Sequence, residues 1–112
     1  MEVTVEKAKE ATAFLKTVAN ENRLMVLWHL AQGEKSVTEL ERLLSIRQPN
    51  LSQQLARLRG EGLVKTRRDA KVIYYSLDST DVFLTIQLMY KLFCAKDESA
   101  TITLERELVM GE

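Results

Sequence analysis

Residues 36–59 read SVTELERLLSIRQPNLSQQLARLR, a pattern that predicts two short helices joined by a tight turn. Ser36 and Glu39 have the spacing of a capping box, in which each side chain accepts a hydrogen bond from the backbone of the other residue at the start of a helix. Pro49 suits the first turn of the second helix, where a backbone N–H would have had no partner. Leucines at intervals of three and four then give this helix one buried side. The stretch therefore predicts a helix-turn-helix.

The segments on either side extend this motif into a winged form. Apolar residues recur at intervals of three and four before Gly33, which suits the end of a helix. After Gly62, two β-prone runs predict a hairpin, and Asp78 or Ser79 can cap a last helix. We therefore expect a mainly α fold with a small β-hairpin, a winged helix-turn-helix in the order helix, helix, helix, helix, hairpin, helix. These elements are expected over residues 5–19, 20–33, 36–44, 49–62, 63–77 and 79–94.

Length and composition fit one domain followed by a tail. The chain has 112 residues, of which 46% are hydrophobic and 29% charged, as in ordinary globular domains. We expect residues 1–95 to form a winged helix-turn-helix domain for DNA binding and dimerisation, followed by an acidic C-terminal tail over 96–112. Two alternatives stay open for this tail, a short helix over residues 104–109 or partial disorder.

The sequence also predicts a cytoplasmic protein without a membrane partner. A single cysteine cannot form a disulfide within the chain, and the N-terminus lacks a basic, then apolar, leader segment. The most apolar stretch, residues 82–94, is shorter than the ~20 residues that a membrane-spanning helix needs. We therefore expect a reducing compartment and no membrane insertion.

The second helix of the motif carries polar side chains beside its leucine stripe, as a DNA-recognition helix requires. Amide side chains can pair with adenine, arginine can pair with guanine, and a small serine permits a close approach to phosphate. The alternative is an ordinary solvated helix face. The expected DNA-binding residues on this helix and in the turn before it are Gln48, Asn50, Ser52, Gln53, Gln54 and Arg57.

Positive charge gathers on this helix and on the hairpin, although the whole chain is neutral, with 16 basic and 16 acidic residues. Residues 47–71 hold seven of the basic residues and two of the acidic ones, so they carry a net charge of +5. Such clustering is typical of proteins that bind duplex DNA. We expect Arg67, Arg68 and Lys71 at the hairpin tip to contact the DNA backbone or minor groove. Alternatively, these charges only protect the sheet edge from aggregation.

Several segments in this order resemble the ArsR/SmtB family of bacterial repressors. They are LKTVANENRL at 15–24, SVTEL at 36–40, LSQQLARLR at 51–59, GLV at 62–64 and YYSL at 74–77. Within about residues 6–95, the SQQL helix, the wing and a last helix ending in LFC are most similar to the group that includes HlyU, BigR and SqrR. The resemblance implies a homodimeric transcriptional repressor in the bacterial cytoplasm, nucleoid-associated when it binds an inverted repeat in a promoter. It also implies that the first and last helices form the dimer interface.

The residues of the last helix predict a dimer independently of this resemblance. Its apolar side chains surround it almost completely between residues 82 and 93. A helix that is apolar on all sides must be covered on all sides, and one subunit of this size has too few elements to do so. A second copy of the chain is therefore the expected cover.

The same resemblance bears on what the regulator senses. Metal-sensing members of the family carry a cysteine pair in the third helix or Asp and His ligands on the last helix; this chain has neither, so we expect no metal and no cofactor. Thiol-based members of the similar group pair the cysteine that matches Cys94 with a second one in the second helix, where this chain has Trp28. Either Cys94 acts alone as a redox or sulfide sensor, or it is inert core.

The residues of the chain give little support to other functional classes. His29, the only imidazole, can titrate or bind a metal across a dimer, but a surface or hydrogen-bonded structural role fits it better. No Ser/His/Asp arrangement, phosphate-binding glycine loop or carboxylate pair predicts catalysis, so we expect no enzyme and no catalytic residue. The rival is a winged-helix regulator or protein-interaction module without thiol or metal sensing. As an interaction module, it predicts no sequence-specific binding to DNA.

Overall fold

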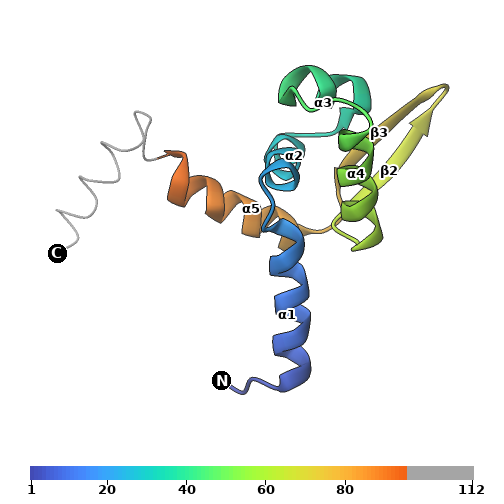
Figure 1. Ribbon diagram of the computed structural model, residues 1–112. Helices are drawn as coiled ribbons and strands as arrows, with labels where there is room; N and C mark the ends of the chain where they lie inside the picture. Colours follow the sequence, from blue (N-terminus) through green and yellow to red (C-terminus); the bar gives the residue numbers. More distant parts are fainter. Residues whose placement is uncertain (96–112) are drawn as a thin grey trace.

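The computed structural model describes residues 1–95, so the acidic tail predicted over 96–112 lies outside the described residues. Within residues 1–95, five helices and three short strands follow one another in the winged order (Figure 1). The predicted mainly α fold with a small β-hairpin is confirmed. The elements are α1 (Val5–Val18), α2 (Glu21–Ala31), β1 (Lys35–Ser36), α3 (Val37–Leu44), α4 (Asn50–Gly60), β2 (Val64–Asp69), β3 (Val72–Leu77) and α5 (Thr80–Phe93).

Helix α2 forms the centre of the core, since it packs against α1, α3, α4, α5 and β3. Each neighbour contributes an apolar stripe to this contact, and α4 inserts the three leucines that its spacing predicted. Burial of these side chains is the main favourable term that holds α4 at a fixed angle on the domain. The fully or nearly buried apolar residues are Val26, Leu27, Leu30, Leu40, Ile46, Leu51, Leu55, Leu58, Leu63, Val64, Val82 and Ile86.

Local signals define the helix-turn-helix largely as expected. The capping box of α3 is present, with Ser36 Oγ accepting from the Glu39 backbone at 3.2 Å and Glu39 Oε1 accepting from the Ser36 backbone at 3.0 Å. One boundary differs from the prediction. Pro49 is the N-cap residue of α4, and the helix begins at Asn50. A proline immediately before the first turn still removes an N–H that the helix does not use.

The wing contains a strand that the sequence pattern did not indicate. The predicted hairpin is formed by β2 and β3, and β1 adds a third antiparallel strand, giving the order β1-β3-β2. Strand β1 has only two residues, in which Lys35 pairs with Tyr75 and Ser36 with Tyr74. Two residues are too few for a period-2 pattern. Their pairing joins the start of α3 to the wing.

Gly62 ends α4 in a left-handed conformation, with φ of +77°. The Gly62 N–H donates to Arg59 O and the Leu63 N–H donates to Leu58 O, both at 3.0 Å. These two bonds are the Schellman motif, which satisfies carbonyl groups at the end of a helix. The chain then enters β2 at the angle that this turn sets.

Gly62→Ala is expected to lower the free energy of unfolding by about 1–2 kcal/mol, because an L-residue is strained at positive φ. Urea denaturation measures the effect. Gly60→Ala is the matched control: a Cβ at either position has open space, but Gly60 lies in the helix at ordinary φ, where alanine is favoured. Equal loss of stability in both variants would show that φ is not the cause.

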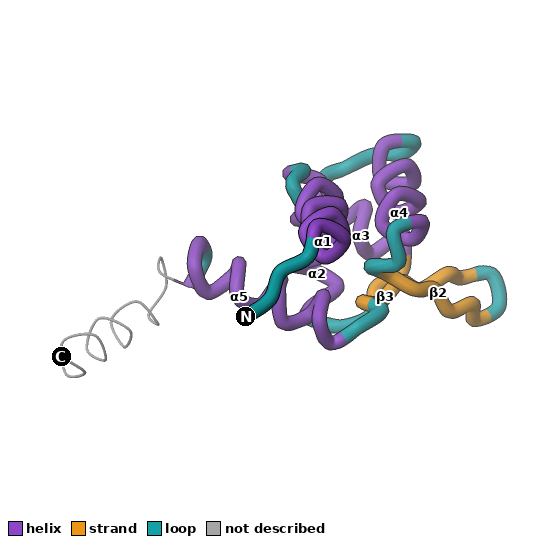
Figure 2. Tube along the Cα trace, turned by 90° about the horizontal axis from the view of Figure 1, so that it is seen from below, coloured by secondary structure: helices purple, strands orange, loops and turns teal. Residues whose placement is uncertain are grey.

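Helices α1 and α5 extend away from the body of the domain in different directions (Figure 1). Figure 2 looks almost along α1 and shows α5 extending to one side. Helix α5 buries Val82 and Ile86 but leaves other apolar side chains exposed, and α1 exposes Val5 and Leu15. Single exposed leucines are common on protein surfaces, but a continuous stripe is not. Among residues 1–95, no helix is both long and apolar enough to cross a membrane.

Candidate nucleic-acid interface

Helix α4 presents polar side chains on the side opposite its three buried leucines. Gln53 lies opposite this leucine stripe and is exposed. Within residues 1–95 its side-chain amide makes no hydrogen bond, so both ends of the amide are available. Gln53 is therefore the residue of α4 best placed for a bidentate pair with a base edge.

Gln48 and Ser52 lie together at the N-terminal end of α4. Gln48 Oε1 accepts from the Ser52 backbone N–H at 3.0 Å and also from the Ser52 hydroxyl, while its Nε2 donates to Glu41 Oε1 at 3.2 Å. The Gln48 side chain thus caps α4, a role that Pro49 cannot fill. Both residues are exposed, and the helix N-terminus that they cap attracts phosphate.

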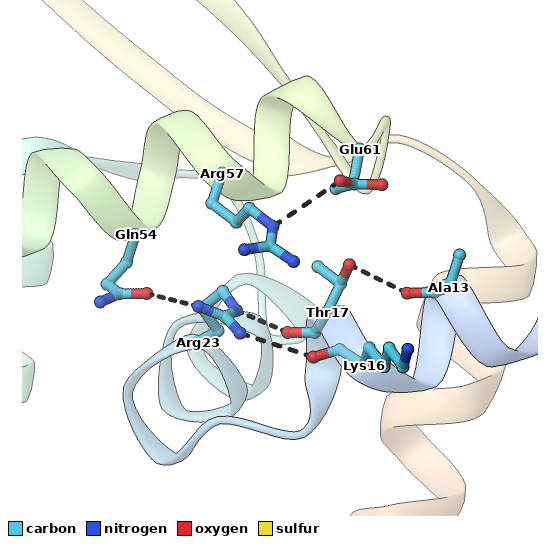
Figure 3. Close-up of polar contacts among 7 residues, drawn as sticks. All are labelled: Ala13, Lys16, Thr17, Arg23, Gln54, Arg57 and Glu61. Atoms are coloured by element: carbon cyan, nitrogen blue, oxygen red, sulfur yellow. Dashed lines mark hydrogen bonds and ion pairs between the residues drawn. The ribbon is translucent and has the colours of Figure 1, made fainter.

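Gln54 occupies a different place from the one that the sequence suggested. Its Oε1 accepts from Arg23 Nη1 at 3.0 Å (Figure 3). Its Nε2 donates to Asn50 Oδ1 at 2.9 Å. These two bonds direct both ends of the amide toward other residues of the domain, which disfavours a bidentate pair with adenine. Arg23 comes from α2, 31 positions earlier in the chain, and no local pattern indicates this contact. We therefore expect Gln54 to position its neighbours, while Asn50 remains exposed.

Arg57 lies on the same side of α4 as Gln54, near the C-terminal end of α1 (Figure 3). Its Nε is 3.6 Å from Glu61 Oε1 in an ion pair that is about half exposed. Burial, and to a smaller extent the charge of Arg57, lower the pKa of Arg23. An exposed ion pair contributes little and can exchange its partner, so Arg57 stays a candidate for a phosphate contact.

Arg67 is engaged within the domain. Its Nη2 and Nε donate to the two carboxylate oxygens of Glu34 at 2.7 and 3.1 Å, and its guanidinium lies 4.5 Å from the centre of the Tyr74 ring. The hydrogen bond from Arg67 lowers the pKa of Glu34, and the same bond raises the pKa of Arg67. A forked pair of this kind fixes the wing to the segment before β1. Within the guanidinium, this pair leaves mainly Nη1, which lies 4.0 Å from Asp69 Oδ2, for the expected DNA contact.

Arg67→Ala is expected to lower the melting temperature at pH 7 and to leave DNA affinity nearly unchanged. The depressed pKa of Glu34 means that its pairing stabilises the fold above the pKa of the unfolded chain and is lost as the pH falls. The melting temperatures of wild type and variant should therefore converge below about pH 4. Thermal denaturation between pH 3 and 7 tests this, and a gap that stays constant would contradict the role of the pair.

Arg68 lies on the opposite face of the wing, the face turned toward α4. Side chains alternate along a strand, so Arg68 shares its face with Thr66 and the buried Val64. Tyr75 on that face lines a groove of about 370 Å³ together with Ser52, Ala56 and Arg59 of α4. Arg68 is exposed, and it lies on the strand face from which Tyr75 reaches this groove. Lys71 is exposed in the turn between β2 and β3.

Arg59 is a candidate that the sequence reasoning did not select. It was counted in the positive cluster, but its place beside Tyr75 follows from the packing of α4 on the wing. A cation at this position suits a phosphate between the helix and the wing.

The residues considered for sensing lie on α2 and α5. The Trp28 indole N–H donates to Ile86 O at 3.3 Å and so tethers α2 to α5. Cys94 is half-buried and is the C-cap residue of α5. Burial, followed by the charge of Lys35, lowers the pKa of His29, which is therefore neutral at pH 7. Among residues 1–95, no three His, Cys, Asp or Glu side chains gather as metal ligands.

Known proteins share both sequence and fold with this chain. Residues 20–66 match the family described as bacterial regulatory protein, arsR family. A biofilm growth-associated repressor of Agrobacterium fabrum is 50% identical over 94 residues, which cover 84% of this chain and 80% of the relative. Reduced HlyU from Vibrio cholerae superposes with a TM-score of 0.77 at 44% identity, over 80% of this chain and 94% of HlyU. The transcriptional repressor BigR from Xylella fastidiosa superposes with a TM-score of 0.76 at 43% identity, over 80% of this chain and 92% of BigR.

These similarities extend beyond the helix-turn-helix to most of the winged domain. Identity of this order over at least four fifths of each protein implies common descent as well as a common fold. The resemblance noted in the sequence, to the HlyU and BigR group, is confirmed. The chain belongs to the ArsR family of bacterial regulatory proteins, which are DNA-binding transcription regulators and not enzymes.

Proposed function

We propose that the chain is a homodimeric repressor that binds an inverted-repeat operator in a promoter and occludes it. The observation that carries this proposal is the exposed Gln53 amide on the side of α4 opposite the buried leucines, which makes no hydrogen bond within residues 1–95. Arg59 of α4 and Arg68 of the wing are also exposed. A polar helix face fits the major groove, where amides read base edges, and flanking cations fit the phosphates.

Repression is favoured over activation on physical grounds. The Agrobacterium fabrum relative is named a repressor, whereas the Vibrio cholerae relative is named a transcriptional activator, so relatives act in both directions. Occupying a promoter is sufficient to repress it. Activation requires a further contact, or the displacement of another protein. When bound to its operator, the protein would be associated with the nucleoid.

We assign the dimer interface to α1 and α5. Leu84, Leu88 and Leu92 form a stripe at four-residue spacing on α5 and are 54%, 55% and 43% exposed. Val5 and Leu15 of α1 are also exposed. A twofold axis through these helices would place two copies of α4 about one DNA turn apart, roughly 34–36 Å, which fits an inverted repeat.

We propose Cys94 as the sensor thiol, acting without a second cysteine in its own chain. Trp28 is engaged with Ile86 at the position where similar thiol regulators carry the partner cysteine. Oxidation of Cys94 to a sulfenic acid, or its persulfidation, would place a polar group at the end of the proposed dimer helix. A regulator without thiol sensing is the alternative.

Fluorescence anisotropy with the DNA upstream of its own gene tests this proposal. The reduced protein should bind this DNA far more tightly than a shuffled duplex, and peroxide or polysulfide should weaken binding in wild type but not in Cys94→Ser. Tight binding that is indifferent to oxidant would leave a regulator without a thiol sensor. Absence of specific binding to any promoter DNA would favour the protein-interaction module.

A further inference from the structure

Arg23 lies between helices and joins the end of α1 to α4 (Figure 3). Its guanidinium donates to Thr17 O, to Lys16 O at 3.5 Å and to Gln54 Oε1 at 3.0 Å. The last carbonyls of a helix have no partner within the helix, and Arg23 supplies donors to two of them. Thr17 is 1% exposed and Arg23 is half-buried, so the bonds from Arg23 to Thr17 O and Gln54 Oε1 are partly shielded from water.

The chemistry of Arg23 determines how the next two side chains are turned. A guanidinium can only donate hydrogen bonds, so the Gln54 atom that faces it must be the carbonyl oxygen. The Gln54 NH₂ group therefore faces Asn50, where it donates to Oδ1 at 2.9 Å. The Asn50 NH₂ group is left free of this chain of bonds. We name Arg23, Gln54 and Asn50 the amide relay.

We propose that the amide relay makes Asn50 a hydrogen-bond donor toward DNA and thereby sets the base that this position of α4 selects. Asn50 is exposed and is the first residue of α4, and the N-terminal residues of a recognition helix are those that meet base edges. This inference rests on the proposed function, because it requires α4 in the major groove. Arg23 is then a positioning residue, which sets the specificity of Asn50 without touching DNA.

A donor-only asparagine has a different preference from a free one. Pairing with adenine uses Oδ1 as an acceptor and Nδ2 as a donor at the same time. Gln54 takes one lone pair of Oδ1 and holds this oxygen turned inward, so the NH₂ group is the end of the amide that is left for DNA, and it suits acceptors. Guanine offers two adjacent acceptors, N7 and O6, and thymine offers O4, whereas adenine places the N6 donor beside its N7 acceptor. We expect guanine or thymine at the base that Asn50 contacts in each half-site.

Gln54→Glu reverses the direction of the hydrogen bond between this side chain and Asn50, while the side chain keeps its size and shape. One carboxylate oxygen accepts from Arg23, and the other can only accept, so the Asn50 NH₂ group must turn inward. Asn50 Oδ1 then faces DNA, where it suits the donors N6 of adenine and N4 of cytosine. Gln54→Leu removes the hydrogen bonds to Arg23 and Asn50, so the Asn50 side chain can rotate. Gln32→Glu makes the same amide-to-carboxylate change at the exposed C-cap of α2, and so controls for the added charge.

Selection of bound duplexes from a random-sequence library by each variant measures these preferences. Gln54→Glu is expected to change one position in each half-site from guanine or thymine to adenine or cytosine, by about tenfold or more in relative affinity. Gln54→Leu should lose the base preference at this position, and Gln32→Glu should keep the preference for guanine or thymine. Arg23→Met should also weaken the base preference at this position and at no other. The melting temperature of this variant is measured to confirm that it folds.

Two results would overturn the role of the relay. One is a Gln54→Glu protein that selects the wild-type consensus. The other is an Asn50→Ala protein that keeps every base preference while losing affinity, because Asn50 would then contact phosphate. A wild-type protein that enriches no consensus at all contradicts the proposed function itself, and the relay falls with it.

Discussion

The double substitution Leu84→Glu and Leu88→Glu is expected to convert the proposed dimer into a monomer and to lower operator affinity by about 100-fold or more. Both leucines are more than half exposed in one chain and lie on one stripe of α5. If a partner covers them, two carboxylates per chain would be buried without partners, which costs several kcal/mol. A monomer would also lose the advantage of binding two half-sites at once.

Sedimentation velocity reports the oligomeric state, and anisotropy reports the affinity. Leu43→Glu is the control, since it places the same charge on an exposed leucine of α3, outside the proposed interface, and should stay dimeric. A double variant that sediments as a dimer would contradict the assignment of α5.

Arg68→Ala combined with Lys71→Ala is expected to weaken binding to operator and random DNA by similar factors, on the order of 100-fold at low salt. Both residues are exposed on the wing, and Arg68 lies on the face turned toward α4. If each contacts a phosphate, a dimer loses four such contacts, and the slope of log K against log salt becomes shallower by about 3–4.

Titrations at several salt concentrations measure this slope. Lys7→Ala, which removes an exposed lysine from the side of α1 opposite Val5, should leave it unchanged. An unaltered slope in the wing variant would mean that these cations only protect the sheet edge.

The parts of the fold that depend on neighbouring residues were predictable from the sequence. The capping box of α3 and the glycine turn after α4 each act within six positions of the chain. The leucine stripe of α4 follows from helical geometry alone. The position of Pro49 was wrong by one residue, because a proline fits both the first turn and the residue before it.

The parts of the interface that depend on distant residues were not predictable. The sequence predicts DNA contacts for Gln54 and Arg67 but gives no sign of their partners within the domain, Arg23 and Glu34, which lie 31 and 33 positions earlier. No periodicity relates residues so far apart, and only packing brings them together. Strand β1 was missed for the same reason, since it exists only through its pairing with β3.

If α4 reads the DNA sequence through its exposed amide, Gln53→Ala should reduce sequence discrimination and leave non-specific binding intact. Anisotropy at constant salt should be measured for wild type and variant, each with a selected operator and with a shuffled duplex. Wild type is expected to prefer the operator by at least about 10³-fold. Gln53→Ala should lose about 1–3 kcal/mol on the operator and nothing on the shuffled duplex. Equal losses on both duplexes, or a wild type that does not distinguish them, would contradict sequence reading by α4.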